Sequence, residues 1–110
     1  MEVFNRELAL EMVGDEEELL KELERSFVFD KTFDRNQLDL LIQKGDMKEA
    51  AGYVHSFKGA ARQIAAERAA YAGQLLEDLL RGKSQGDLKS LEENFEKELS
   101  LAVATVKSDL

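Results

Sequence analysis

The amino-acid sequence predicts an all-α protein, built as an antiparallel up-down-up-down four-helix bundle with a short extra helix at its N-terminus. Three observations predict this class. The chain has no proline, and it is rich in leucine, glutamate, lysine and alanine, which favour helices. Apolar residues recur every three or four positions along most of its length, as on the buried face of a helix. Short connections between such segments make antiparallel neighbours the simplest arrangement.

Three Gly-Asp pairs mark the expected helix boundaries: Gly14-Asp15, Gly45-Asp46 and Gly86-Asp87. Glycine can adopt the left-handed conformation that ends one helix, and aspartate can cap the start of the next. The first two aspartates each have a glutamate three residues later, close to the capping-box pattern. We therefore expect a helix to begin at each aspartate.

The N-terminal half is expected to hold two helices. The pattern predicts a short helix over residues 5–13, with Leu8 and Met12 facing inward. A longer helix is predicted over residues 15–44. Its aromatic and β-branched patch at residues 27–34 weakens the helical signal, which leaves a kink or a break into two helices open. We favour a continuous or kinked helix, because a strand at this place would have no partner strand.

The C-terminal half is expected to hold three helices, at residues 46–63, 67–81 and 87–107, with a loop at 82–86. The first of these carries one apolar stripe, made of Ala50, Val54, Phe57, Ala61 and Ile64. The last carries another, made of Leu88, Leu91, Phe95, Leu99, Ala102 and Val106. Alanine-rich stripes on the helices at 46–63 and 67–81 indicate that these two helices pack closely together.

Length and composition limit the functions to consider. A chain of 110 residues is the size of one domain, so we expect residues 1–110 to form a single domain. The formal net charge is −8, which argues against binding to nucleic acid or to an anionic membrane surface. No apolar run approaches the length of a membrane span, and there is no cysteine. We expect a cytoplasmic, monomeric protein.

His55 is the only histidine of the chain. At about 100° per residue, it lies about 140° from the apolar stripe of its helix and faces solvent. Lys58 and Arg62 are expected on the same outer side, one and two turns further along. An exposed imidazole beside two cations is an arrangement that could carry out chemistry at the surface.

Small residues surround the histidine: Ala51, Gly52 and Gly59. A glycine inside a helix costs roughly 1 kcal/mol relative to alanine. Both glycines fall on the histidine side of the helix rather than on its apolar stripe. Access by a partner molecule explains them better than packing between helices.

Other readings of this region are weaker. A lone surface histidine often has no role. A metal site would need further ligands, and no second histidine exists and no carboxylate lies three or four residues from His55. Ser56 projects about 100° away from His55, which disfavours a nucleophile–base pair. The acidic runs at residues 16–18 and 92–93 are expected to be solvated helix faces, so we predict no metal centre.

The segment 55–61, HSFKGAA, followed by 64–66, IAA, resembles the signature of histidine-containing phosphotransfer (HPt) domains. That signature is approximately H-x-L-K-G, then a hydrophobic residue and G-A. The positions of the first two Gly-Asp pairs and of Leu76-Glu77 are also similar to the family's layout, so the resemblance covers nearly the whole chain. Three residues depart from it: Phe57 and Ala69 replace leucines, and Ala65 replaces a glycine.

The resemblance implies a phosphoryl carrier of a two-component phosphorelay. By this reading His55 accepts a phosphoryl group, through Nε2, from the aspartate of one receiver domain and passes it to the aspartate of another. Lys58 would offset the charge of the transferring group, with Arg62 adding to this, and Gly59 would let the partner approach. The implied partners are receiver domains of response regulators or a hybrid histidine kinase, and no cofactor is implied.

Glu77 matches a family position at which a glutamine or glutamate binds the other imidazole nitrogen. If the helices on either side of Ala65 are antiparallel, residue 77 returns level with residues 54 and 55. Gly73, one turn earlier, would leave room for the ring. A carboxylate in this place would fix the tautomer of the histidine.

Two alternative functions remain open at the sequence level. One is the phosphoacceptor domain of a chemotaxis-type histidine kinase, which would receive its phosphoryl group from ATP on a neighbouring kinase domain. The other is a helical adaptor that binds a receiver domain without transferring phosphate. The sequence is compatible with a free-standing protein and with a domain of a larger one.

Overall fold

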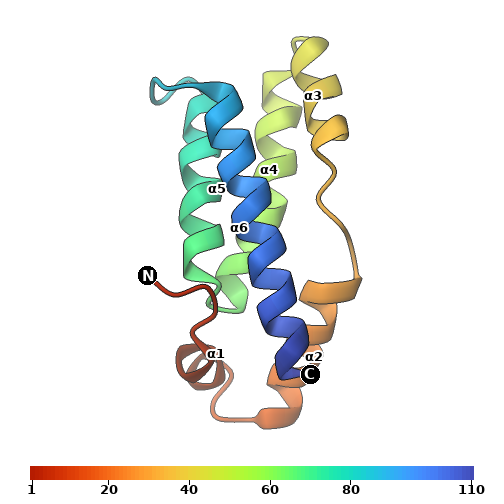
Figure 1. The fold of residues 1–110 in the computed structure, drawn as a ribbon, viewed down its shortest axis with the longest axis vertical. Helices are drawn as coiled ribbons and strands as arrows, with labels where there is room; N and C mark the ends of the chain where they lie inside the picture. The colour runs from red at the N-terminus through yellow and green to blue at the C-terminus, as the bar shows by residue number, and fades with distance from the viewer.

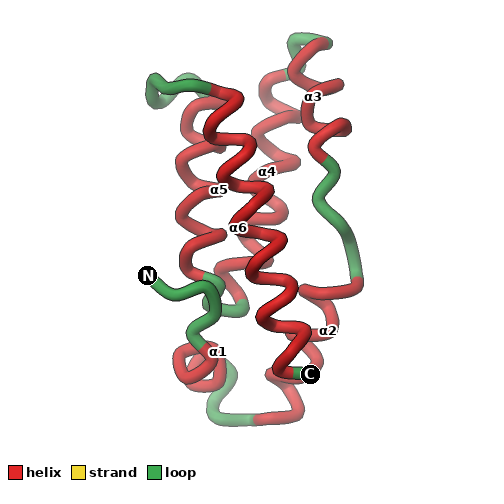
Figure 2. The backbone as a smooth tube through the Cα atoms, in the orientation of Figure 1, coloured by secondary structure: helices red, strands yellow, loops and turns green.

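The computed structural model describes all 110 residues and contains six helices and no strand. Figure 1 shows their order and Figure 2 the loops that join them. None of the helices combines the length and the apolar character that crossing a membrane requires. The helices are α1 (Arg6–Met12), α2 (Glu17–Phe29), α3 (Arg35–Gln43), α4 (Met47–Gln63), α5 (Glu67–Leu80) and α6 (Leu88–Asp109).

Helices α4, α5 and α6 lie side by side along the long axis of the molecule, and successive helices run in opposite directions (Figure 1). The most extensive contact between any two helices is that of α4 with α5, followed by that of α5 with α6. Close packing of the two alanine-rich helices is therefore confirmed. Helices α2 and α3 lie one after the other along the remaining side, and α1 lies at the end where the C-terminus is also found.

Gly45-Asp46 ends α3 and begins α4 as predicted, whereas Gly86-Asp87 only begins α6, because α5 already ends at Leu80. The Asp46 carboxylate accepts a hydrogen bond from the amide of Glu49 at 3.2 Å, and that of Asp87 accepts one from Ser90 at 3.0 Å. The prediction that Asp15 begins a helix is wrong. Asp15 itself adopts a left-handed conformation with φ of 64°, because the turn from α1 to α2 needs a second left-handed residue after Gly14. Helix α2 then starts at Glu17 without a side-chain cap.

The predicted continuous helix over residues 15–44 is also wrong, and the alternative of a break is correct. Helix α2 ends at Phe29, residues 31–34 have no regular secondary structure, and α3 begins at Arg35. The ring of Phe33 packs against Phe57 at 5.4 Å and Phe95 at 5.2 Å between centroids. Asp34 caps α3 by accepting the amide of Asn36 at 2.9 Å. Aromatic burial and a new cap together offset the helical hydrogen bonds lost at the break.

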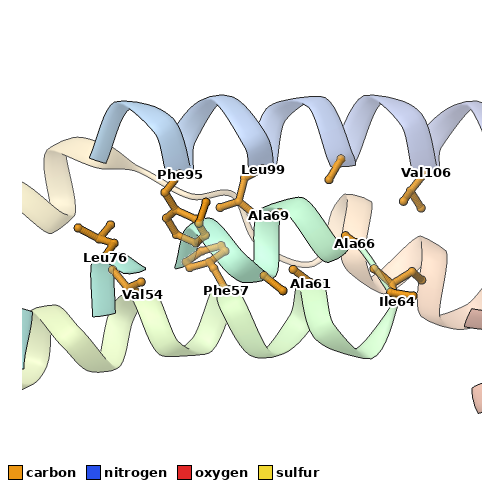
Figure 3. Close-up of a cluster of buried hydrophobic side chains, with 14 of the residues drawn as sticks. Val54, Phe57, Ala61, Ile64, Ala66, Ala69, Leu76, Phe95, Leu99 and Val106 are labelled. Atoms are coloured by element: carbon orange, nitrogen blue, oxygen red, sulfur yellow. The ribbon is translucent and has the colours of Figure 1, made fainter. Parts of the chain in front are cut away.

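The hydrophobic core lies between α4, α5 and α6 (Figure 3). All five residues of the predicted α4 stripe are buried, and so are Phe95, Leu99, Ala102 and Val106 of α6. The prediction for the first helix fails, because Leu8 and Met12 are 37% and 51% exposed. Ala9 is the buried residue of α1. That helix has only seven residues, so its few apolar positions do not determine which side faces inward.

The acidic pair at residues 92–93 divides between surface and interior. Glu93 is exposed, as predicted, but Glu92 is only 4% exposed, so the prediction of a solvated face is wrong for that residue. Arg35 of α3 lies against it, with 3.6 Å between Nε and Oε2. Because α3 starts where the sequence predicted a helix interior, this partner could not be anticipated.

Candidate functional site

His55 lies in the middle of α4 with its ring turned outward. Its side chain is 58% exposed, whereas Val54 and Phe57 on the same helix are buried. The helix is fixed in rotation by its apolar stripe, so the position of the imidazole follows from the periodicity of the sequence. The solvent-facing orientation agrees with the prediction.

Glu77 of α5 meets this ring. Both of its carboxylate oxygens lie 3.1 Å from His55 Nδ1, although the two residues are 22 positions apart. The chain reverses through Ala65, which adopts a left-handed φ of 57°, and α5 returns alongside α4. A carboxylate accepts a hydrogen bond and cannot donate one. Nδ1 is therefore the protonated nitrogen, and the lone pair of the neutral ring lies on Nε2.

Lys58 does not lie on the outer face, contrary to the prediction. It is only 4% exposed, and its Nζ lies 2.8 Å from Glu77 Oε1 and 2.9 Å from Gln74 Oε1. A position three residues after His55 is rotated by about 60° towards one side, and here that side is covered by α5. The ammonium group is held between the two helices, where it balances the carboxylate that contacts the histidine.

Glu77 is the centre of this polar group. Arg81 Nε donates to Glu77 Oε2 at 2.8 Å, so the carboxylate has bonding partners on His55, Lys58 and Arg81. Burial by itself would raise the pKa of Glu77. The hydrogen bonds from Lys58, Arg81 and His55 outweigh burial and lower this pKa from 4.5 to about 2. Glu77 is thus a carboxylate at any physiological pH.

Sequence reasoning missed Gln74, Asp78 and Arg81. Gln74 accepts from Lys58 and donates to Asp78 Oδ1 at 2.8 Å, which orients the amide towards the ammonium group. Arg81 follows Glu77 by one helical turn, and this i,i+4 spacing of opposite charges was the signal that could have revealed it. For Gln74 the sequence carries no comparable signal, since its partner Lys58 belongs to another helix.

Gly73 has a different role from the predicted one. We expected it to leave room for the imidazole. A Cβ built on Gly73 would lie 2.8 Å from Phe95 Cε1 and 2.9 Å from Lys58 Cβ. The glycine therefore accommodates the stem of the buried lysine and a core aromatic ring, and it allows α5 to approach α4.

The surface of α4 around His55 is free of bulky side chains at the two glycines and is covered by α5 along one edge. Around a Cβ placed on Gly52 or Gly59 no atom lies within 4 Å, which agrees with the predicted lack of bulk. Ala51 is fully buried, because it lies on the same edge of α4 as Lys58, facing α5. Its side chain is therefore not part of the exposed surface around the ring. Arg62 is exposed two turns from the histidine.

The arrangement around His55 is suited to nucleophilic chemistry. One ring nitrogen is fixed by a charged acceptor and the other faces solvent with its lone pair, as a nucleophile requires. Positive charge that develops on the ring during attack would be stabilised by Glu77. No group of three or more histidine, cysteine, aspartate or glutamate side chains is placed to hold a metal ion.

Comparison with protein families shows that residues 7–109 match the Hpt domain. Since the match spans nearly the whole chain, the protein belongs to the Hpt domain family. Hpt domains take part in histidine phosphotransfer in phosphorelay signalling, where they interact with receiver domains and kinases. Comparisons with curated proteins and with solved structures gave no match.

Proposed function

We propose that this Hpt domain is a phosphoryl carrier in which His55 is the phosphoacceptor, taking the group from the aspartate of one receiver domain and passing it to the aspartate of another. The observation that carries the proposal is the pairing of His55 Nδ1 with Glu77 at 3.1 Å on a ring that is otherwise exposed. This contact leaves Nε2 as the only nucleophilic nitrogen, directed to the outside where a partner can reach it.

The transfer would proceed by attack of the Nε2 lone pair on phosphorus. The N–P bond forms as the P–O bond of the acyl phosphate breaks, and the electron pair of that bond returns to the receiver's aspartate as a carboxylate. The ring retains its proton on Nδ1 and becomes positively charged, and the Glu77 carboxylate stabilises that charge. In the second half of the cycle an aspartate of the next receiver attacks phosphorus, and the neutral ring is restored.

Lys58 supports the proposed reaction indirectly. Its ammonium group is engaged with Glu77 and Gln74, so we assign it the role of holding the carboxylate in place beside the ring rather than contacting the phosphoryl group. Arg81 shares this role from the other carboxylate oxygen. Arg62 is the exposed cation of the face, and we propose that it contacts the partner or the transferring group.

The partner would dock over α4. Gly52 and Gly59 present backbone without side chains near the ring, which would allow the active-site loops of a receiver domain to approach Nε2. The receiver would also supply its own metal ion and other catalytic groups. We interpret the fold as an antiparallel four-helix bundle in which α2 and α3 together form one member, and we propose that residues 1–110 act as one monomeric domain.

A phosphotransfer assay tests the proposal. The protein is incubated with a panel of receiver domains labelled at their aspartates, and the label on the Hpt chain is checked for loss in acid and persistence in alkali. We expect label on the wild type and none on His55→Gln, whose circular dichroism should be unchanged because the side chain is exposed. Label that persists in His55→Gln contradicts the site. Binding of receivers without any label favours the non-transferring adaptor.

A further inference from the structure

A cavity of about 720 Å³ lies between α2, the linker at residues 30–33, α4 and α6. Its volume falls within the range of about 300–1,000 Å³ that is typical of small-molecule sites in proteins. Neither His55 nor Glu77 lines it, so it is separate from the site proposed for phosphotransfer. The proposed phosphoryl transfer makes no use of this space.

The local sequence explains why the cavity exists. Ser26 of α2, Ala60 of α4, and Ser100 and Ala104 of α6 all contribute to its lining. Side chains of this size on three neighbouring helices leave space between the helices. On the remaining side the lining comes from the linker, which has no regular secondary structure (Figure 2).

The interior of the cavity is largely apolar. Phe57 and Ile64 of α4 and Leu99 of α6, which are labelled in Figure 3, belong to the buried core and also line the cavity. Leu23 and Phe27 of α2, one helical turn apart, are partly buried and line it as well. A hydrocarbon chain placed among these side chains would be removed from water, which favours its binding.

Two lysines line the cavity without a carboxylate partner. In a chain with a formal net charge of −8, neither Lys31 nor Lys107 forms an ion pair. Their ammonium groups lie over aromatic rings instead, at 4.6 Å from the centroid of Phe57 and 6.0 Å from that of Phe29. Lys31 also donates to Ser56. Because an ammonium group has three donors, both lysines retain the capacity to bind an anion.

The two acidic residues of the lining already have partners within the protein. Asp30 accepts a hydrogen bond from Ser26 Oγ at 2.6 Å, and Glu96 lies 3.8 Å from Arg35 Nη1. Their charges nevertheless limit the ligand, since a head group with several negative charges would be repelled by them. The lining therefore complements an apolar molecule that carries one negative charge.

We propose that this cavity binds a medium-chain carboxylate. The hydrocarbon chain lies between α2 and the core residues of α4 and α6, and the carboxylate is held by the uncompensated positive charge of Lys31 and Lys107. Because three helices and the linker bound the space, it admits a slender, flexible chain more readily than the surface of a folded protein.

A titration of the whole chain with octanoate, decanoate and dodecanoate tests the proposal. Calorimetry gives the affinities, and amide ¹H and ¹⁵N shifts locate the ligand. We expect binding to tighten by about threefold to fourfold for each added methylene until the cavity is filled. The shift changes should concentrate in the cavity-lining residues of α2, the linker and α6.

The role of the charges is tested separately. In the double variant Lys31→Met, Lys107→Met we expect the affinity for decanoate to fall by about tenfold or more, while that for decanol is unchanged. Lys97 provides the matched control, because it is an exposed lysine of α6 that does not line the cavity. Lys97→Met should bind decanoate as the wild type does.

A variant that fills the space completes the test. Val103 of α6 is partly buried and lines the cavity, so Val103→Phe should abolish binding of decanoate and decanol alike. If that variant does not fold, the lysine variants decide the matter. Equal affinity of the wild type for decanoate and decanol, or equal losses in Lys97→Met and the double variant, overturns the proposal. Shifts of the lining residues that depend on protein concentration without ligand show that a second copy occupies the cavity, and they also overturn it.

Discussion

Lys58 Nζ and His55 Nδ1 share one oxygen atom, Glu77 Oε1, at 2.8 Å and 3.1 Å. The two residues are three positions apart on α4, yet one is buried and the other is exposed. The carboxylate between them is therefore both the partner of a buried ammonium group and the acceptor for the proposed phosphoacceptor. The stability of the fold and the reactivity of the imidazole therefore depend on the same side chain.

Replacement of Glu77 should change the tautomer of His55. In Glu77→Ala the ring loses the acceptor for Nδ1–H, so we expect a shift towards the Nε2-protonated form and phosphotransfer slowed by about tenfold or more. The chain has one histidine, and its ¹⁵N signals can be read without ambiguity. Glu77→Gln retains an acceptor oxygen and should preserve the wild-type tautomer. A wild-type ring already protonated on Nε2 contradicts the prediction.

Lys58 and Arg62 should differ in their effect on stability. Lys58→Met leaves the buried Glu77 carboxylate with fewer partners, and we expect a loss of about 2 kcal/mol in the free energy of unfolding. Arg62→Ala changes an exposed side chain and should alter it by less than about 0.5 kcal/mol. Urea unfolding monitored by circular dichroism measures both. Equal effects would place Lys58 on the surface instead.

Replacement by alanine should change the stability of the protein in opposite directions at Gly73 of α5 and Gly59 of α4. Gly73→Ala forces a methyl group against Phe95 and Lys58 at under 3 Å, and we expect destabilisation of about 1–3 kcal/mol. Gly59→Ala meets no neighbouring atom and should stabilise α4 by up to about 1 kcal/mol. If Gly59 lies under the docked receiver, phosphotransfer by this more stable variant should nevertheless be slower. Thermal unfolding and the transfer assay together distinguish the two effects.

Glu77 should make the protein sensitive to acid. The pKa of Glu77 is lowered from 4.5 to about 2. Its contribution to the free energy of unfolding is therefore fully present above pH 4.5 and is lost as the pH falls towards 2. The shift corresponds to about 3 kcal/mol at most. Urea unfolding at pH 5 and pH 3 should show a smaller loss of stability for Glu77→Gln than for the wild type. Identical losses would show that Glu77 does not carry this dependence.

The position of His55 could be predicted because it depends only on helical periodicity. Five apolar residues on one stripe determine which side of α4 faces the core, and the histidine follows from them. The start of α4 at Met47 was equally accessible, since the Asp46 cap is a local interaction. The helix break at residues 30–34 was not, because it depends on the contact of Phe33 with rings from α4 and α6.

By itself, the sequence determined the helical class, most of the helix boundaries and the outward direction of His55, because these depend on interactions between residues close together in the chain. The tertiary structure decided the environment of the site. It buried Lys58 and Ala51 under α5, placed Arg81 and Gln74 around the carboxylate, and used Gly73 for packing. These outcomes depend on how closely and at what level two helices meet, which helical periodicity within one segment does not specify. The Glu77 contact to His55 was expected from the family resemblance, and its geometry was fixed only when α5 packed on α4.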